Sequence, residues 1–380
     1  PLISETIDVQ KEINDYKNMA KKFIDQAYSQ DKKKVSESQI NSNCEEFRKM
    51  WTPTKYENPI MYRQFLDIFT DLERTAYNSL HKSNPIFPQL IMYPHNVVFG
   101  TLPTTNIDAA TLLVPESRQY LLIFERDLIN YCYLISKIIA MMLPSTISSK
   151  MNQQHEEFDE SSFFLLKSNN FISSRLITNP IILTQFKVLL EAILVANSAA
   201  KVPGYFLQAP HAFTGNLLAT FMEYFLMGHE YSHIMLNHLG TPQNKIKSPN
   251  FENVEELEYS KEAEIEADLK GLELTINSMS EKGYDISKSF IGCDLYFSFY
   301  DLLMRGRSIL EHGDEFHSSS YCPTTHPSPI ERRNNLRSFV GQTYGDEIIY
   351  GGVMVEKFLE ILWTHSIKFL KEKHEKLKTI

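Results

Sequence analysis

Cysteine is scarce in this chain: there are four among 380 residues, and no two of them are in CxxC spacing. Zinc ribbons and thioredoxin-type redox sites need that spacing, so the sequence excludes both classes. Scattered cysteines in a chain of this length are typical of reduced cytosolic thiols rather than of a disulfide framework. A basic excess is also missing, because 47 acidic residues outnumber 38 basic ones and the net charge is −9. We therefore expect no nucleic-acid partner.

The sequence also lacks an apolar run long enough to cross a membrane. Its most apolar stretch, residues 128–143, is interrupted by Asn130, Ser136 and Lys137. It falls short of the ~20 apolar residues that a spanning helix needs, so we expect a buried core helix there and no membrane span. The first residues do not combine a basic segment with an apolar one, which indicates no signal peptide. Together these absences predict a soluble, cytoplasmic protein.

Helical periodicity dominates the rest of the chain. Strand-like pieces occur only between residues 85 and 127, where prolines separate the segments 96–100 and 120–125. The expected fold is mainly α (α+β), with a small β-sheet early in the chain. Loops are expected at 241–250 and 313–327. Helices are expected from Pro59 to about residue 80, and at about 126–143, 178–200, 214–239, 252–281, 287–312, 328–340 and 346–377.

The segment 221–239 carries a His-Glu-x-x-His motif on a helix that is apolar on nearly every face, and therefore buried, with its polar residues gathered in one stripe. His229 and His233 are four residues apart, so their imidazoles lie on successive turns of one face and can reach one zinc ion at ~2.1 Å. Glu230 projects beside them, placed to contact a metal-bound water without ligating the metal. The motif on this helix predicts a Zn²⁺ site; the alternative is a helical scaffold in which the motif arose by chance.

A catalytic zinc takes three protein ligands and keeps one open position. His238 falls on a different face from His233, so we do not expect it to bind the same ion. In the next helix, Glu264, Asp268 and Gly271 lie between two apolar strips, and buried carboxylates are costly unless paired or metal-bound. We predict Glu264 as the third ligand and Asp268 as the acceptor of a hydrogen bond from the outer nitrogen of a ligating histidine. Gly271 would let another helix approach closely.

Three separated segments resemble gluzincin metallopeptidases of the CAAX prenyl protease and HtpX type. They read GHEYSHIMLNH at 228–238, SKEAEIEADLKG at 260–271 and THPSPIERRNNL at 325–336. The resemblance implies a zincin-like metallopeptidase domain over 85–345. The remaining chain divides into an N-terminal helical region over 1–84 and a C-terminal helix over 346–380 packed on the core. Membrane members of that family have transmembrane helices, which this chain lacks.

The resemblance implies zinc on His229, His233 and Glu264, with Glu230 as the general base. The function expected is a zinc-dependent endopeptidase that hydrolyses peptide bonds in a protein or peptide substrate through a metal-activated water. The alternative is a latent or non-catalytic zinc-stabilised protein that acts by binding. Zinc with no turnover on denatured protein would favour that alternative.

The third segment and the family's substrate strand supply further candidates. The resemblance implies that His326 lies near the metal, in a position to stabilise the oxyanion, and that Arg332 lies near the site. Without the resemblance, His326 reads as a turn residue among prolines and Arg332 as the ion-pair partner of a buried acid. His317 and Tyr321 are weaker candidates in the same loop. Family members bind the substrate backbone along an extended edge strand, for which the candidates are Tyr120, Leu121, Leu122 and Ile123.

Overall fold

A computed structural model gives the fold, and its contact pattern separates two units. The first comprises residues 1–128 and 230–258, and the second comprises 129–229 and 259–380. Neither predicted domain boundary, at 84/85 or at 345/346, coincides with this division. The residues that the structure describes are 59–83, 97–102, 109–114, 119–144, 169–238, 245–247, 255–257, 260–317 and 327–378.

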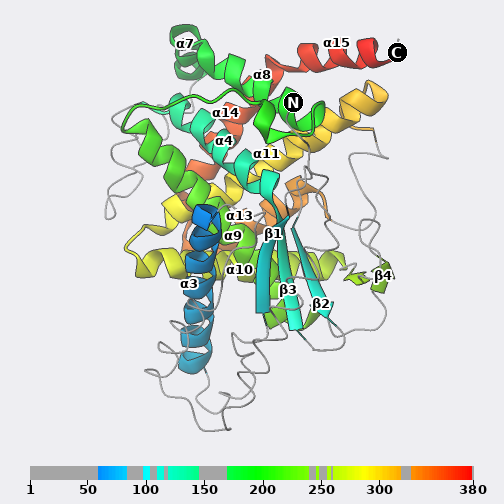
Figure 1. The fold of residues 1–380 in the computed structure, drawn as a ribbon. Helices are drawn as coiled ribbons and strands as arrows, with labels where there is room; N and C mark the ends of the chain where they lie inside the picture. Colours follow the sequence, from blue (N-terminus) through cyan, green and yellow to red (C-terminus); the bar gives the residue numbers. More distant parts are fainter. Residues whose placement is uncertain are drawn as a thin grey trace. The chain divides into compact units, whose positions relative to one another are not determined.

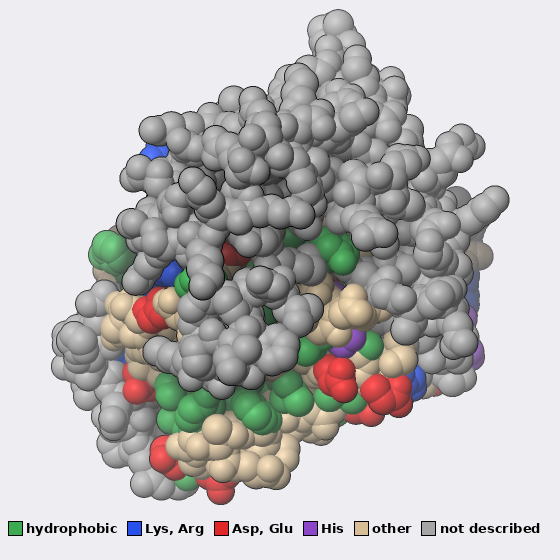
Figure 2. Space-filling model, turned by 90° about the horizontal axis from the view of Figure 1, so that it is seen from below, with side chains coloured by type: hydrophobic (Ala, Val, Ile, Leu, Met, Phe, Trp, Pro, Cys, Tyr) green, Lys and Arg blue, Asp and Glu red, His purple; other side chains and the backbone are tan. Residues whose placement is uncertain are grey.

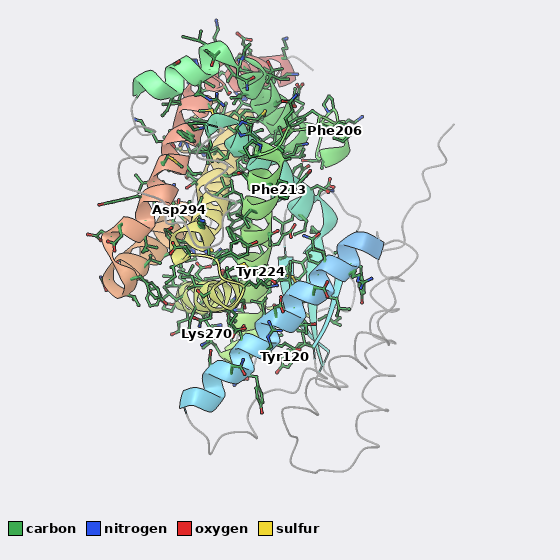
Figure 3. All side chains as sticks on the ribbon, turned by 90° about the vertical axis from the view of Figure 1, so that its left-hand side faces the viewer. Tyr120, Phe206, Phe213, Tyr224, Lys270 and Asp294 are labelled. Atoms are coloured by element: carbon green, nitrogen blue, oxygen red, sulfur yellow. The ribbon has the colours of Figure 1, made fainter. Side chains whose placement is uncertain are left out.

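The described part of the first unit contains a long helix and a three-stranded sheet. The helix α3 spans Pro59–Ser83, close to its predicted bounds. In the sheet, β1 (Val97–Leu102) pairs in parallel with β3 (Gln119–Glu125), and β3 pairs antiparallel with β2 (Ala109–Val114). The order is therefore β1-β3-β2, as Figure 1 shows. The helix α3 crosses the strands in Figure 3. Phe65 of α3 stacks on Phe124 of β3, with ring centroids 5.8 Å apart.

The predicted substrate edge is wrong for Tyr120 and its neighbours. Tyr120, Leu121, Leu122 and Ile123 belong to β3, the central strand, whose two sides pair with β1 and β2. A strand paired on both sides has no open row of backbone groups for a substrate. The sequence reasoning overlooked β2 as a strand because its segment, AATLLV, begins with two alanines and has no alternating polar pattern.

A short second hairpin also departs from expectation. β4 (Lys245–Lys247) pairs antiparallel with β5 (Glu255–Leu257). The first of these segments was expected in a loop and the second at the start of a helix. Strands of three residues have too little periodicity to be recognised from sequence, since their pairing depends on tertiary contacts.

Helices make up most of the second unit, so the predicted mainly α class is confirmed. The helix α4 (Arg126–Met142) is the expected core helix, with Ile135 and Ile139 fully buried. None of the described helices has the length and apolarity that crossing a membrane requires. The remaining helices are α7 (Asn169–Thr178), α8 (Ile181–Leu194), η2 (Ala199–Lys201), α9 (His211–Met235), α10 (Lys261–Glu281), α11 (Ile286–His312), α13 (Pro329–Tyr344), η5 (Asp346–Ile349), α14 (Tyr350–Thr364) and α15 (Ile367–Leu377).

Helix α11 is the centre of the second unit, because α8, α10, α13, α14 and α15 all pack against it. Its Phe290 and Phe297 join Phe225 of α9, Leu272 of α10 and Leu336 of α13 in one buried cluster. The C-terminal segment, expected as a single helix, is divided into α14 and α15 at residues 365–366. On the face of the molecule seen in Figure 2, acidic side chains are more prominent than basic ones, in keeping with the net charge.

Local capping determines where α10, α11 and α13 begin. Ser260 accepts a hydrogen bond from the backbone N–H of Ala263, and Ser328 accepts one from that of Glu331. The carboxylate of Asp285 accepts a hydrogen bond from the backbone N–H of Ser287. Such residues satisfy backbone donors that a first helical turn leaves without partners. The starts of α10 and α13 determine which faces present the acidic and basic side chains described below.

Candidate metal centre

The helices α9 and α10 touch backbone to backbone at a pair of glycines. A Cβ placed on Gly271 would lie 2.7 Å from the backbone nitrogen of His229, and one on Gly228 would lie 3.0 Å from the carbonyl oxygen of Gly271. Neither position has room for a side chain. The close approach that the sequence predicted for Gly271 is therefore confirmed, and it brings the acidic residues of α10 to His229 of α9.

Three side chains meet at this crossing. His229, His233 and Glu264 are buried, and each offers a ligand atom within 4.8 Å of the others. Oε2 of Glu264 lies 3.6 Å from Nε2 of His229. Ligands bound at ~2.1 Å in a tetrahedron are ~3.4 Å apart, so two imidazoles and one carboxylate at this spacing fit a metal ion. The cluster is thus able to bind a metal, and the three residues are those that the sequence singled out.

Asp268 holds the other side of His229. Its Oδ1 lies 2.9 Å from Nδ1 of His229, which is the contact that the sequence predicted. The two acids, Glu264 and Asp268, are 4% and 2% exposed. With Nδ1 held by Asp268, the ring of His229 directs Nε2 toward Glu264.

Arg332 of α13 lies against both buried acids. Its Nε and Nη2 donate to Oδ2 and Oδ1 of Asp268 at 2.7 and 2.6 Å, and its Nη1 lies 3.3 Å from Oε2 of Glu264. The guanidinium also lies over the ring of Phe297, 4.8 Å from the centroid. Arg332 is therefore both close to the cluster and an ion-pair partner of buried carboxylates, so the two interpretations made from sequence describe one arrangement.

The charges of this group leave a place for a cation. Burial lowers the pKa of Arg332, but the charges and hydrogen bonds of Asp268, together with Glu264, outweigh it and raise that pKa, so the guanidinium stays cationic. The two buried carboxylates share this guanidinium and the imidazole of His229. Burial also lowers the pKa of His229, and its hydrogen bond and charge interaction with Asp268 reverse the direction and raise it. Asp268 and Glu264 thus raise the pKa of both Arg332 and His229, and the same two carboxylates would attract a bound metal ion.

Glu230 is held by a strand that sequence analysis missed. The hydroxyl of Thr111 on β2 lies 2.7 Å from Oε2 of Glu230 and 3.1 Å from its carbonyl oxygen. Thr111 is buried, and a buried hydroxyl needs a hydrogen-bond partner. A lone threonine among apolar residues in the segment AATLLV was the available signal for such a contact.

His238 lies closer to the cluster than expected. Its Nδ1 is 3.0 Å from Nδ1 of His233, although helical periodicity placed the two residues on different faces. The helix α9 ends at Met235 rather than at 239, and Asn237 adopts a left-handed φ of 57°. Periodicity no longer applies beyond that turn, so the expectation about its face is wrong.

Of the other candidates, the structure describes only His317. His326 and Tyr321 are outside the residues that the structure describes. His317 stacks on His312 with ring centroids 3.9 Å apart.

Compared with known protein families, curated proteins and solved structures, the chain has no match. The interpretation of the site therefore depends on its own geometry.

Proposed function

We propose that this protein is a zinc-dependent endopeptidase. The observation that carries the proposal is the buried cluster of His229, His233 and Glu264, with Glu230 next to the first histidine in the chain and held by Thr111. Two histidines and one glutamate are a ligand set of catalytic zinc sites in peptidases. The three segments that resemble gluzincin metallopeptidases support the same activity, and they include four of these five residues, all but Thr111.

The role of each side chain follows from its position. His229, His233 and Glu264 would hold the metal. When bound, Zn²⁺ supplies Lewis acidity, which brings the pKa of a water toward ~7 and polarises a carbonyl. Glu230 accepts a proton from the attacking water and returns it to the nitrogen of the leaving amine. Thr111 orients the carboxylate of Glu230 for both transfers.

The ligand atoms and the cysteines bear on which metal the site would bind and on the compartment of the protein. Imidazole and carboxylate together suit Zn²⁺ better than Mg²⁺ or Ca²⁺, which prefer oxygen ligands alone. The proposed substrate is a protein or peptide, as the resemblance to metallopeptidases implies, and the carbonyl carbon of its peptide bond is the atom that the activated water attacks. The described cysteines, Cys132 and Cys293, are buried free thiols, which favours a reducing compartment such as the cytoplasm.

The decisive experiment compares wild-type protein with Glu230→Gln. Both should bind about one zinc ion per chain, because Glu230 is not a ligand. Wild type should cleave a denatured protein, and Glu230→Gln should be slower by about 10²–10⁴-fold because the general base is lost. Cleavage by Glu230→Gln at the wild-type rate would refute the mechanism. Zinc binding without cleavage of any denatured protein would replace the proposal by a zinc-stabilised binding protein.

A second pair of variants tests the ligand set. Glu264→Ala should lose zinc, whereas Glu262→Ala should retain it, because Glu262 is exposed on the same helix. Metal content measured on the purified proteins distinguishes the two. Equal zinc content in both variants would contradict the assignment of Glu264.

A further inference from the structure

The two histidines of the cluster are held in different ways. A histidine that binds a metal uses one ring nitrogen, and the N–H on the other is usually held by a neighbouring acceptor that orients the ring. For His229 that acceptor is the carboxylate of Asp268, at 2.9 Å. For His233 the neighbour is the imidazole of His238, whose Nδ1 lies 3.0 Å from Nδ1 of His233.

His233 is buried, so its contact with His238 takes the place of a hydrogen bond to water. His233 is only 1% exposed, so bulk water does not hold its outer nitrogen. The ring centroids of His233 and His238 are 5.1 Å apart and the ring planes are inclined by 68°. With the two Nδ1 atoms only 3.0 Å apart, each nitrogen lies on the side of its ring that faces the other, which suits a hydrogen bond along the in-plane lone pair of the acceptor.

The end of α9 brings His238 to this position. After Met235, the backbone N–H of Asn237 donates to the carbonyl oxygen of Ile234 at 3.1 Å, and Asn237 adopts a φ of 57°. Left-handed backbone is unfavourable for most residues, and asparagine is among the few that tolerate it. The turn reverses the chain, so the next side chain folds back onto the last turn of the helix.

We propose that His238 is a positioning residue for the metal ligand His233. The Nδ1–H of His233 donates to Nδ1 of His238, which carries its own proton on Nε2. The ring of His233 is thereby fixed with Nε2 directed to the metal. His238 itself is not a ligand. This inference rests on the metal site of the proposed function, and it adds a residue that holds the site without touching the metal.

The partners of the two ligand histidines differ in charge. Asp268 is an acid and makes His229 a more basic ligand, whereas His238 is an imidazole that accepts a hydrogen bond only in its neutral form. The acceptor at position 238 can therefore be supplied by another neutral group. Asparagine is suitable, because its amide oxygen occupies nearly the same place along the side chain as Nδ1 of histidine.

The test measures zinc affinity rather than cleavage. Wild type, His238→Phe and His238→Asn are titrated with Zn²⁺ in competition with a chelating indicator. His238→Phe should bind zinc about 10–100-fold more weakly, the usual effect of losing such a partner. His238→Asn should restore most of the affinity. Unfolding of the metal-free proteins, followed by circular dichroism, checks that each variant folds.

A matched pair of backbone variants tests the turn. Asn237→Val should weaken zinc binding, because a β-branched residue disfavours the left-handed backbone that returns His238 to His233. Asn197 has a φ of 43° and lies outside the cluster, so Asn197→Val carries similar strain. It should leave zinc affinity unchanged. Equal weakening in both would contradict the role of the turn.

The outcomes separate this inference from the proposed function. Zinc affinity of His238→Phe equal to wild type would overturn the inference and leave the peptidase standing. Equal losses in His238→Phe and His238→Asn would also overturn it, because they would make His238 a ligand or a packing residue. If wild type binds zinc and cleaves nothing, the peptidase fails while the affinities still decide the role of His238. If wild type binds no zinc, both fail.

Discussion

Thr111 shows how a single hydroxyl contributes to the proposed chemistry. It donates to the carboxylate of Glu230 at 2.7 Å, and hydrogen bonds to charged groups are worth about 1.5–3 kcal/mol. We expect Thr111→Val, which keeps the shape and loses the donor, to lower kcat by about 10–100-fold with zinc content unchanged. Thr111→Ser should retain most of the activity. Steady-state cleavage of a denatured protein measures both, and a Val variant as active as wild type would exclude this role.

Glu73 of α3 is a buried acid whose charge is costly. It is 8% exposed, and its Oε1 has no hydrogen-bond partner among the described residues. Burial raises its pKa well above 4.5, and its charge in turn adds to the burial that raises the pKa of Tyr231. An unfolded chain ionises Glu73 near the ordinary value, while the folded chain keeps it protonated to higher pH. Stability is therefore lost as pH rises from that value through the folded pKa.

The expected consequence is that Glu73→Gln stabilises the protein in a pH-dependent way. Below the ordinary glutamate pKa the two proteins should unfold alike, because the carboxyl is neutral in both states. Above it the variant should gain stability, and the gain should level off beyond the folded pKa. Chemical denaturation at several pH values measures the difference. Glu281→Gln, on the exposed end of α10, is the control and should show no such trend.

At the level of single residues, the sequence predicted those whose positions follow from helical periodicity. His229, His233, Glu264 and Asp268 lie on two helices, and three to four residues per turn determine which face each one occupies. Thr111 was missed because its contact with Glu230 joins residues far apart in the chain. His238 was misplaced because Asn237 ends the helix in a left-handed turn, which no periodic pattern describes.

Among the elements, the contact of α9 with α10 is the most sensitive to a single change. A Cβ at Gly271 would meet backbone atoms of Gly228 and His229 at 2.7–3.0 Å, and backbone atoms have little room to move. We expect Gly271→Ala to force the helices apart, with a cost of about 1–3 kcal/mol in stability and a weaker zinc site. Denaturant unfolding and zinc titration measure the two effects.

The control for this variant is Gly204→Ala. A Cβ at Gly204 meets no described atom within 4 Å, and the residue lies in an exposed segment before α9. That variant should unfold and bind zinc as wild type does. If Gly271→Ala also behaves as wild type, the two helices are not held as closely as the structure shows.

The predicted elements succeeded where local chemistry determines them. The helices α11 and α13 follow the capping residues Asp285 and Ser328, close to their predicted starts at 287 and 328. The helix α10 follows the cap Ser260, so its start is later than the predicted 252, although its end at Glu281 agrees with the prediction. The strands β2 and β5 were not predicted, because each forms only through pairing with its partner strand. The C-terminal segment was predicted as one helix because its periodicity continues almost unbroken across the break between α14 and α15.

For the whole molecule, the net charge of −9 includes carboxylates that are buried rather than exposed to solvent. Glu264 and Asp268 are buried in the second unit, and Arg332 compensates only part of their charge. Two acids buried beside one guanidinium and one imidazole bring like charges close together, so the folded protein without metal should be less stable than its well-packed core would suggest. A bound dication would lower this repulsion.

Zinc should therefore stabilise the fold as a whole. A ligand that binds only the folded state adds RT ln(1 + [L]/Kd), or about 2.7 kcal/mol at a hundredfold excess over Kd. We expect Tm to rise by several degrees on adding Zn²⁺ to the metal-free protein and to fall again with a chelator. The shift should shrink at acidic pH, because protonated imidazoles do not bind metals. Differential scanning calorimetry measures it.

The control for this effect is His233→Ala, which removes a ligand from a buried position. Its Tm should be insensitive to zinc, even if the cavity lowers stability in the absence of metal. An equal zinc-dependent shift in the variant and in wild type would place the stabilising ion elsewhere in the molecule. Unchanged Tm in both would mean that the acids of α10 are balanced without a metal, so that the cluster is a purely structural feature.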